Sequence, residues 1–262
     1  MKSEGPTHAQ APAHPDVALT AASPYRDHAG PRTAIIFDVD GVLLRSPHER
    51  AWRDALAGFA DPARFTPALY RSEVAGKPRL DGALAALLVL GVPDASERAA
   101  DYAAHKQARL EAMMAEGRVE AFPDALRLVL ALRTRGIPMA AASSSRNATA
   151  MMREIRLDDG ETLLDALTAD VSGRPVSHGK PDPDLFLLAA EALKGRPRHC
   201  VVIEDAVVGI EAARRGGMRV IGLARSGEAD QLASAGADMV VEDLDEIDVE
   251  ALANGQLERH AA

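Results

Sequence analysis

Two aspartates separated by one residue, Asp38 and Asp40, follow the apolar run at 33–37. In an extended segment, side chains two positions apart point the same way, so both carboxylates would face one ligand. A carboxylate can attack phosphorus when nearby cations neutralise the charge, because positioning and neutralisation supply most of the catalysis in phosphoryl transfer. The second carboxylate could protonate the leaving oxygen and later activate the acceptor. The pair therefore suits phosphoryl transfer.

Three further polar clusters could complete such a site, namely Ser143-Ser144-Ser145, Lys180 and Glu204-Asp205. Crowded carboxylates are costly unless a cation lies among them. Oxygen ligands favour Mg²⁺ over zinc and would accept Mn²⁺ as well. Lys180 would add a second positive charge, and the serine hydroxyls would bind phosphate oxygens. An aspartate after a strand could simply be a helix cap, but four compatible groups together indicate a site.

Five short apolar runs, each continuous rather than alternating, predict strands that are buried on both faces. The runs lie at 33–37, 137–142, 200–203, 219–223 and 239–241. Segments with helical spacing of apolar residues separate them. This alternation predicts an α/β fold, a doubly wound parallel sheet whose ligands bind beyond the carboxyl ends of the strands. The polar clusters would therefore meet at one edge of the sheet.

The alternation of strand and helix is interrupted between 46 and 119, where no run is typical of a strand. A capping box with proline at the first helical position is predicted at 46–49. Helical patterns also cover 81–90 and 94–117. We therefore expect a flexible N-terminal arm at 1–31, an α/β core at 32–46 and 120–255, and an inserted all-helical cap domain at 47–119.

Composition excludes several classes of function. The formal net charge of -9 argues against nucleic acid as a partner. No stretch approaches the length of a membrane helix, and residues 1–31 lack the apolar region of a signal peptide. The single cysteine, Cys200, suits the reducing cytoplasm. We expect a small phosphorylated metabolite as the partner and no membrane, and we favour a monomer, although the sequence does not give the oligomeric state.

The four motifs in this order resemble the haloacid dehalogenase (HAD) superfamily of phosphotransferases. The resemblance extends over about 33–252. The second aspartate argues against a true dehalogenase, which needs no such acid. The resemblance implies Asp38 as the nucleophile, Asp40 as the acid and base, and Lys180 as the catalytic lysine. It also implies Mg²⁺ ligands from Asp38, Asp205, the Asp40 carbonyl group and Glu204.

The predicted cap contains a closer resemblance, to the β-phosphoglucomutases. The segment 76–81 (GKPRLD) resembles their Gly-x-x-Arg-x-Asp substrate loop, in which the arginine holds the distal phosphate of a sugar bisphosphate. The implied substrate-binding residues are Lys77, Arg79, His48 and Lys106 in the cap, with Ser143, Ser144, Ser145 and Asn147 in the core. The alternatives are an exposed basic loop for the arginine, a first-turn helix position for the histidine, and a solvated helix position for Lys106.

Three functions fit these residues. The first is a sugar-phosphate mutase of the β-phosphoglucomutase type, in which phosphorylated Asp38 gives its phosphoryl group to a sugar phosphate. The second is a sugar-phosphate phosphatase, in which water attacks the same intermediate. The third is a binding protein on a disabled scaffold, against which the intact motifs argue. The identity and the anomer of the sugar stay open.

Overall fold

The computed structural model describes residues 33–260 of the 262-residue chain. The predicted N-terminal arm at 1–31 lies outside the described residues and stays a prediction. Among the described residues, no helix combines the length and the apolar character that crossing a membrane requires.

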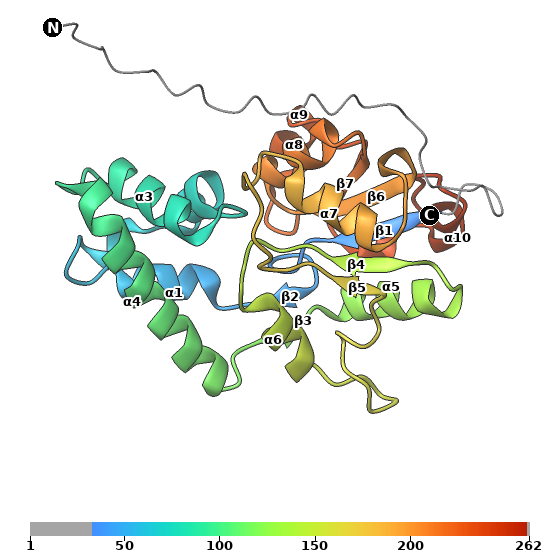
Figure 1. Cartoon of the computed structure of the whole chain (residues 1–262), viewed down its shortest axis with the longest axis horizontal. Helices are drawn as coiled ribbons and strands as arrows, with labels where there is room; N and C mark the ends of the chain where they lie inside the picture. Colours follow the sequence, from blue (N-terminus) through green and yellow to red (C-terminus); the bar gives the residue numbers. More distant parts are fainter. Residues whose placement is uncertain (1–32, 261–262) are drawn as a thin grey trace, which may run out of the picture. The chain divides into compact units, whose positions relative to one another are not determined.

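The central element is a six-stranded parallel sheet with the strand order β5-β4-β1-β6-β7-β8 (Figure 1). The strands are β1 (Ala34–Phe37), β4 (Met139–Ala141), β5 (Ala169–Asp170), β6 (Cys200–Glu204), β7 (Arg219–Leu223) and β8 (Met239–Val241). Phe37 lies opposite Ala141 of β4 and Ile203 of β6. The residues that follow β1, β4 and β6 therefore emerge together at one edge of the sheet.

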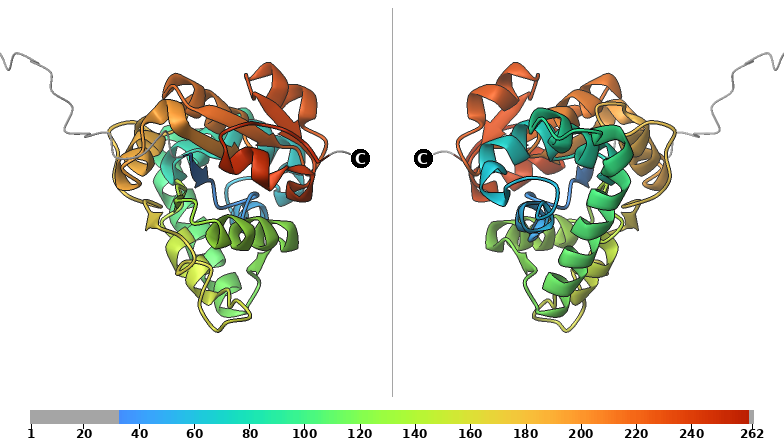
Figure 2. Two further views of the ribbon diagram at one scale, coloured as in Figure 1. Left: turned by 90° about the vertical axis from the view of Figure 1, so that its right-hand side faces the viewer. Right: turned by 90° about the vertical axis from the view of Figure 1, so that its left-hand side faces the viewer.

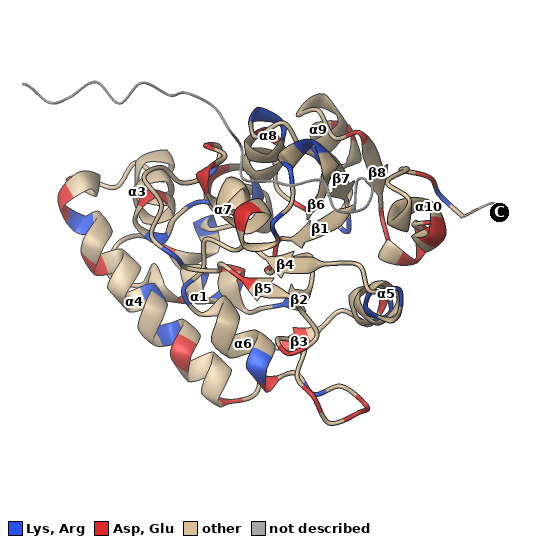
Figure 3. Ribbon diagram, turned by 45° about the vertical axis from the view of Figure 1, so that its right-hand side comes forward, with Lys and Arg blue, Asp and Glu red and all other residues tan. Residues whose placement is uncertain are grey.

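Helices cover both faces of this sheet, because successive side chains of a strand point to opposite faces. Ile35 and Phe37 belong to a core cluster with residues of three helices, α5 (Pro123–Thr134), α6 (Ala148–Glu154) and α10 (Val249–Ala253). Ile36 lies in a second cluster with α7 (Asp184–Ala192), α8 (Val207–Arg215) and α9 (Ala229–Ser234). Figures 1 and 2 show α5 and α8 on opposite sides of the sheet. Charged residues lie mainly outside the strands, which are mostly tan in Figure 3.

A separate helical region follows β1. It comprises α1 (His48–Ala55), α2 (Pro67–Leu69), α3 (Arg79–Val89) and α4 (Ala95–Ala115), with the short helices η1 (Pro62–Arg64) and η2 (Tyr70–Val74). Its own hydrophobic cluster includes Trp52, Phe65, Leu87 and Tyr102, and the Tyr102 hydroxyl donates to the Trp52 carbonyl oxygen at 2.8 Å. We call this region, His48–Ala115, the cap. The prediction of a doubly wound sheet with an inserted helical cap is confirmed, while the exact domain boundaries stay a prediction.

Two short antiparallel strands, β2 (Leu44–Arg45) and β3 (Glu120–Ala121), carry the chain into the cap and back. They pair with each other, so both crossings lie side by side. The remaining short helices of the described residues are η3 (Pro197–His199) and η4 (Leu244–Glu246), which lie in the core region.

The predicted capping box at 46–49 is wrong. Helix α1 begins at His48, and no side chain caps it. The Ser46 side chain instead lowers the pKa of the Asp40 carboxylate, and Glu49 pairs with Arg53 at 3.3 Å. The serine that the pattern assigns to the helix end is therefore a partner of Asp40.

Candidate active site

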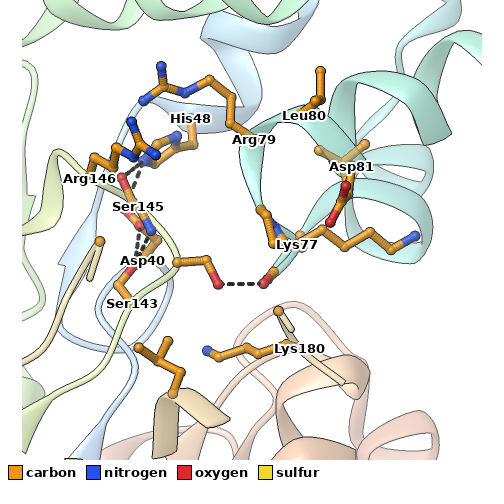
Figure 4. A pocket seen from close by; sticks show the side chains of 18 of the residues that line it. Asp40, His48, Lys77, Arg79, Leu80, Asp81, Ser143, Ser145, Arg146 and Lys180 are labelled. Carbon is orange, nitrogen blue, oxygen red and sulfur yellow. Dashed lines mark hydrogen bonds and ion pairs between the residues drawn. The ribbon is translucent and has the colours of Figure 1, made fainter. Parts of the chain in front are cut away.

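The sheet edge predicted from the sequence opens into a cavity of about 530 Å³. From the core, the predicted residues that line it are Asp38, Asp40, 143–145, Lys180 and Asp205. From the cap, the predicted residues that line it are His48, Lys77, Arg79 and Lys106. Figure 4 shows the labelled members of both groups around one space, with Lys180 and the arginines at separate places in it.

Lys180 makes the closest polar contacts at the floor of the cavity. Its Nζ donates to Asp38 Oδ1 at 2.6 Å and to Glu204 Oε1 at 2.7 Å, and its side chain is wholly buried. Burial lowers the pKa of Lys180, but the two carboxylates outweigh burial and raise it, so the ammonium stays charged. Burial raises the pKa of Asp38 to about 7, against the opposing effect of Lys180. The site thus holds more acidic groups than one lysine neutralises.

Glu204 is positioned behind Lys180 and does not line the cavity. It is fully buried, and its Oε2 accepts a hydrogen bond from the Ala206 backbone N–H at 2.7 Å. A Cβ added at Gly209 would lie 1.7 Å from Glu204 Oε1, so only glycine leaves room for this carboxylate. The geometry makes Glu204 the partner that holds Lys180 and does not favour the ligand role that the resemblance implies for it.

Asp40 lies beside Asp38 and is held by groups from both regions. Ser143 Oγ donates to Asp40 Oδ2 at 3.3 Å, and His48 Nε2 lies 3.2 Å from Asp40 Oδ1. Burial raises the pKa of Asp40, but the contacts with His48 and Ser46 outweigh it and lower the pKa to about 2. Asp40 is therefore an ionised carboxylate in this arrangement.

His48 connects Asp40 to the cap lysine. Lys106 Nζ lies 2.6 Å from His48 Nδ1, and both side chains are buried. Burial lowers the pKa of His48 more than the Asp40 carboxylate raises it, so the ring is neutral. The ammonium then donates to Nδ1, which leaves the proton of the ring on Nε2, facing Asp40. Burial also lowers the pKa of Lys106, to about 7.

The carboxylates at this edge fit a divalent cation. Asp205 follows β6, and a Cβ added at Gly41 would lie 1.9 Å from Asp205 Oδ2, so the carboxylate lies directly against the backbone that follows Asp40. Within residues 33–260, no side chain or backbone N–H pairs with the Asp205 carboxylate. Burial, followed by the charges of Glu204 and Asp38, raises the pKa of Asp205 well above its usual value. An all-oxygen set with surplus negative charge suits Mg²⁺.

A group of hydrogen-bond donors lies above this floor. Ser143 Oγ accepts from the Ser145 backbone N–H at 3.0 Å, and Ser145 Oγ lies 3.3 Å from His48 Nε2. Ser144 Oγ donates to the Gly76 carbonyl oxygen of the cap at 3.0 Å, which joins the serine loop to the predicted substrate loop. The predicted serine cluster therefore contacts Asp40, His48 and the cap at once.

Arginines of the cap and the core face each other elsewhere in the cavity. Burial lowers the pKa of Arg79, and the nearby charge of Arg146 lowers it further. In Figure 4 the two guanidinium groups lie near His48, on the far side of Asp40 from Lys180. Within residues 33–260 neither arginine has an ion pair with a carboxylate, and two such arginines facing one space suit a dianion.

Two predicted substrate residues are placed differently. Asn147 does not line the cavity, because its amide exchanges hydrogen bonds of 2.9 and 3.1 Å with Gln107 of α4. Lys77 lines the cavity, but Figure 4 shows its side chain extending away from Asp40 and Ser143. The substrate-binding assignments of both residues stay predictions that the geometry does not favour.

The cavity-lining residues that were not predicted as site residues include Tyr70 of η2, Arg146 and Arg174. Arg174 lies four residues after β5, which has only two residues and leaves no recognisable pattern. A basic residue in the loop before Lys180 is the only available signal for Arg174. Nothing in the sequence distinguishes Tyr70 from the other aromatic residues of the cap.

Comparisons with known proteins agree with this geometry. Residues 33–217 match the family model of haloacid dehalogenase-like hydrolases. A β-phosphoglucomutase of Mycobacterium bovis is 33% identical over 82% of this chain and 90% of its own length. Hexitol phosphatase A of Escherichia coli is 30% identical over 85% of this chain and 96% of its own length.

Solved structures give the same grouping. The crystal structure of a β-phosphoglucomutase from Pyrococcus sp. matches with a TM-score of 0.67 and 30% sequence identity. The match covers 85% of this chain and 98% of the Pyrococcus chain. Family model, relatives and fold agree with the resemblance seen in the motifs. The chain belongs to the haloacid dehalogenase-like hydrolase family, and it is an enzyme of the phosphotransferase or phosphatase class.

Proposed function

We propose that this enzyme transfers phosphoryl groups on a small sugar phosphate through an aspartyl phosphate on Asp38, and that it is a sugar-phosphate mutase of the β-phosphoglucomutase type. The observation that carries the proposal is the presence of two separate positively charged sites in one cavity. Lys180 lies against Asp38 at 2.6 Å, and Arg79 faces Arg146 elsewhere. A mutase must hold one phosphate at the reacting carboxylate and a second one at a distance, and these two places supply that.

The reaction starts from phosphorylated Asp38. A hydroxyl of the bound sugar phosphate attacks the phosphorus, the new P–O bond forms and the bond to Asp38 Oδ breaks. Asp40 accepts the proton of the attacking hydroxyl, for which its low pKa of about 2 supplies the carboxylate form. The products of this step are a sugar bisphosphate, an Asp38 carboxylate and a protonated Asp40.

The bisphosphate then turns around. Asp38 attacks the other phosphorus, the bond between that phosphorus and the sugar oxygen breaks, and Asp40 returns its proton to this oxygen. Asp38 is phosphorylated again, so the net change is a moved phosphate. His48 and Ser143, both in contact with Asp40, hold its carboxylate where it serves both steps.

Mg²⁺, when bound, would neutralise the charge between a phosphate and the carboxylate that approaches it. Asp38, Asp205 and the Asp40 carbonyl group are the residues proposed to hold it. Lys180 supplies the remaining positive charge, and its bond to Glu204 at 2.7 Å keeps the ammonium aimed at Asp38. Positioning of these charges is the main contribution of the protein to phosphoryl transfer.

The second candidate is a sugar-phosphate phosphatase. Its support is the similarity to hexitol phosphatase A over 85% of this chain. In that reaction water replaces the sugar hydroxyl, Asp40 accepts its proton, and inorganic phosphate leaves Asp38. The floor of the site serves both reactions equally, so only the distal cationic place separates them.

One incubation distinguishes the two functions. Purified protein is mixed with Mg²⁺, β-glucose 1-phosphate and a trace of the corresponding bisphosphate. A mutase produces glucose 6-phosphate without net release of phosphate. Release of inorganic phosphate alone, repeated over a panel of sugar phosphates, would reject the mutase and support the phosphatase.

The distal place is tested by Arg79→Ala, with Lys77→Ala as the matched control from the same loop. Loss of a charged hydrogen bond to phosphate should lower kcat/KM for the sugar phosphate roughly 10- to 100-fold. The same variant should hardly change the turnover of an aryl phosphate, which has no distal phosphate. Equal losses for both substrates, or equal losses for Arg79→Ala and Lys77→Ala, would contradict the assignment.

A further inference from the structure

Arg225 follows β7 after one residue and contacts the backbone directly after Asp40. Its Nε donates to the Gly41 carbonyl oxygen at 3.2 Å, and its NH2 group donates to the Val42 carbonyl oxygen at 3.3 Å. These two carbonyl groups lie 184 and 183 residues away in the chain. A single guanidinium therefore connects the end of β7 to the loop that carries both catalytic aspartates.

The guanidinium itself is fixed from two other sides. Its NH2 group donates to Asp124 Oδ1 at 3.1 Å and lies 2.9 Å from Asp124 Oδ2. Asp124 Oδ2 also accepts from the Leu244 backbone N–H at 2.9 Å, and its side chain is only 4% exposed. The guanidinium carbon lies 3.9 Å from the centre of the Phe122 ring. The planar fork of arginine, stacked on one face and paired along its edge, cannot be replaced by the point charge of lysine.

The contacted loop has little freedom to move without disturbing Asp205. Gly41 has φ +91°, a conformation that favours glycine, and its α-carbon lies directly against the Asp205 carboxylate. A shift of the Gly41 peptide would change the distance between the Asp40 backbone and Asp205. Those are two of the three groups proposed to hold Mg²⁺.

The same guanidinium also lies where the chain enters and leaves the cap. Gly41 and Val42 precede β2, whereas Phe122 and Asp124 follow β3, and the Phe122 backbone N–H donates to the Leu43 carbonyl oxygen at 3.0 Å. Arg225 thus contacts residues on both sides of the paired crossing strands. Motion of the cap would act on the catalytic loop through these strands, and Arg225 holds the core end of both.

We propose that Arg225 is a positioning residue, which fixes the loop after Asp40 against Asp205 and so sets the Mg²⁺ affinity and the turnover of the enzyme. The inference rests on the proposed function for its metal and its reaction. It assigns no contact between Arg225 and substrate. Substitution of Arg225 should therefore lower the Mg²⁺ affinity and kcat and leave KM for the sugar phosphate unchanged.

The test measures Mg²⁺ binding by isothermal titration calorimetry on the substrate-free protein, for the unaltered chain and for Arg225→Gln, Arg225→Lys and Asp124→Asn. Groups that orient metal ligands typically contribute roughly 10- to 100-fold in metal affinity or activity. We expect a loss of that size for Arg225→Gln, and smaller losses for Arg225→Lys and Asp124→Asn. Steady-state kinetics at saturating Mg²⁺ should show a lower kcat and the same KM.

The matched control is Arg127→Gln. Arg127 lies on the same helix as Asp124 and forms an exposed ion pair with Asp245. Loss of this pair should leave Mg²⁺ binding unchanged. The proposal is overturned if Arg225→Gln folds and binds Mg²⁺ with the same affinity as the control. If Arg225→Gln does not fold, Arg225→Lys decides by the same criterion. Failure of both to fold would make Arg225 a residue of core stability and overturn the positioning role. Absence of Mg²⁺ binding by the unaltered chain would instead contradict the proposed function.

Discussion

At the scale of single residues, the site is a chain of groups whose protonation states depend on one another. Asp40 is a carboxylate because His48 and Ser46 lower its pKa, and His48 is neutral because it is buried beside Lys106 at 2.6 Å. Among the cap groups in this chain of contacts, Lys106 has a pKa of about 7, as Asp38 has in the core. The cap therefore contributes a group to the core that changes its charge in the physiological range.

The sign of the resulting pH dependence follows from the direction of this shift. Burial lowers the pKa of Lys106 from 10.5 to about 7, so the ammonium form dominates below pH 7 and is lost as pH rises. An anionic substrate is attracted only by the charged form. We expect kcat/KM for a sugar phosphate to fall as pH rises through about 7, measured from pH 5.5 to 9.

Two variants of Lys106 test the assignment of that pH limb. Arginine stays charged at every pH used, so Lys106→Arg should remove the fall. Lys106→Gln should give a low kcat/KM that no longer changes across pH 7. If kcat/KM of Lys106→Arg still fell with the same midpoint pH, the fall would belong to another titrating group.

At the scale of elements, strand ends were predictable from the sequence and cap contacts were not. The runs at 219–223 and 239–241 match β7 and β8 because continuous apolar residues identify buried parallel strands. Strand β5 has two residues and carries no such pattern. Because the strands are parallel neighbours, the topology alone places the core motifs at one edge of the sheet. The pairing of Asn147 with Gln107, the support of Lys180 by Glu204 and the clamp by Arg225 depend on packing between distant segments, which spacing does not reveal.

A contact between α4 and Asn147, which directly precedes α6, joins the cap to the core. Gln107 and Asn147 exchange two amide hydrogen bonds, and a net hydrogen bond is worth about 1 kcal/mol. Gln107→Ala should therefore shift the cap toward open forms and raise KM for the sugar phosphate roughly 3- to 10-fold, because 1.4 kcal/mol corresponds to a factor of ten. The expected change in kcat is small, since no reacting group is removed.

The matched control for this pair is Arg109→Gln. Arg109 lies on the same helix and pairs with Asp54 at 3.1 Å, within the cap. Its loss should leave KM unchanged, because it joins no core residue. Equal KM values for Gln107→Ala and the unaltered chain would show that the amide pair does not hold the cap.

At the scale of the whole molecule, stability and function oppose each other at the sheet edge. Asp38, Glu204 and Asp205 are gathered around a single ammonium, and burial raises the pKa of both Asp38 and Asp205. A carboxyl whose folded pKa lies above its unfolded value destabilises the fold as pH rises through that range. The metal-free protein therefore carries a cost at neutral pH that a bound cation would offset.

Removal of Mg²⁺ should consequently lower the melting temperature. A ligand at 100 times its Kd stabilises by about 2.7 kcal/mol, and each kcal/mol moves the midpoint by roughly 2–4 °C in a chain of this size. We expect a rise of roughly 5–10 °C with saturating Mg²⁺ at pH 7.5, reversed by a chelator, in a thermal melt. Asp205→Asn removes both a proposed ligand and a surplus charge, so it should melt above the metal-free unaltered protein and gain nothing from Mg²⁺. If Mg²⁺ still raised the melting temperature of Asp205→Asn, the cation would bind elsewhere. If metal-free Asp205→Asn melted below the metal-free unaltered protein, Asp205 would stabilise the fold without a metal.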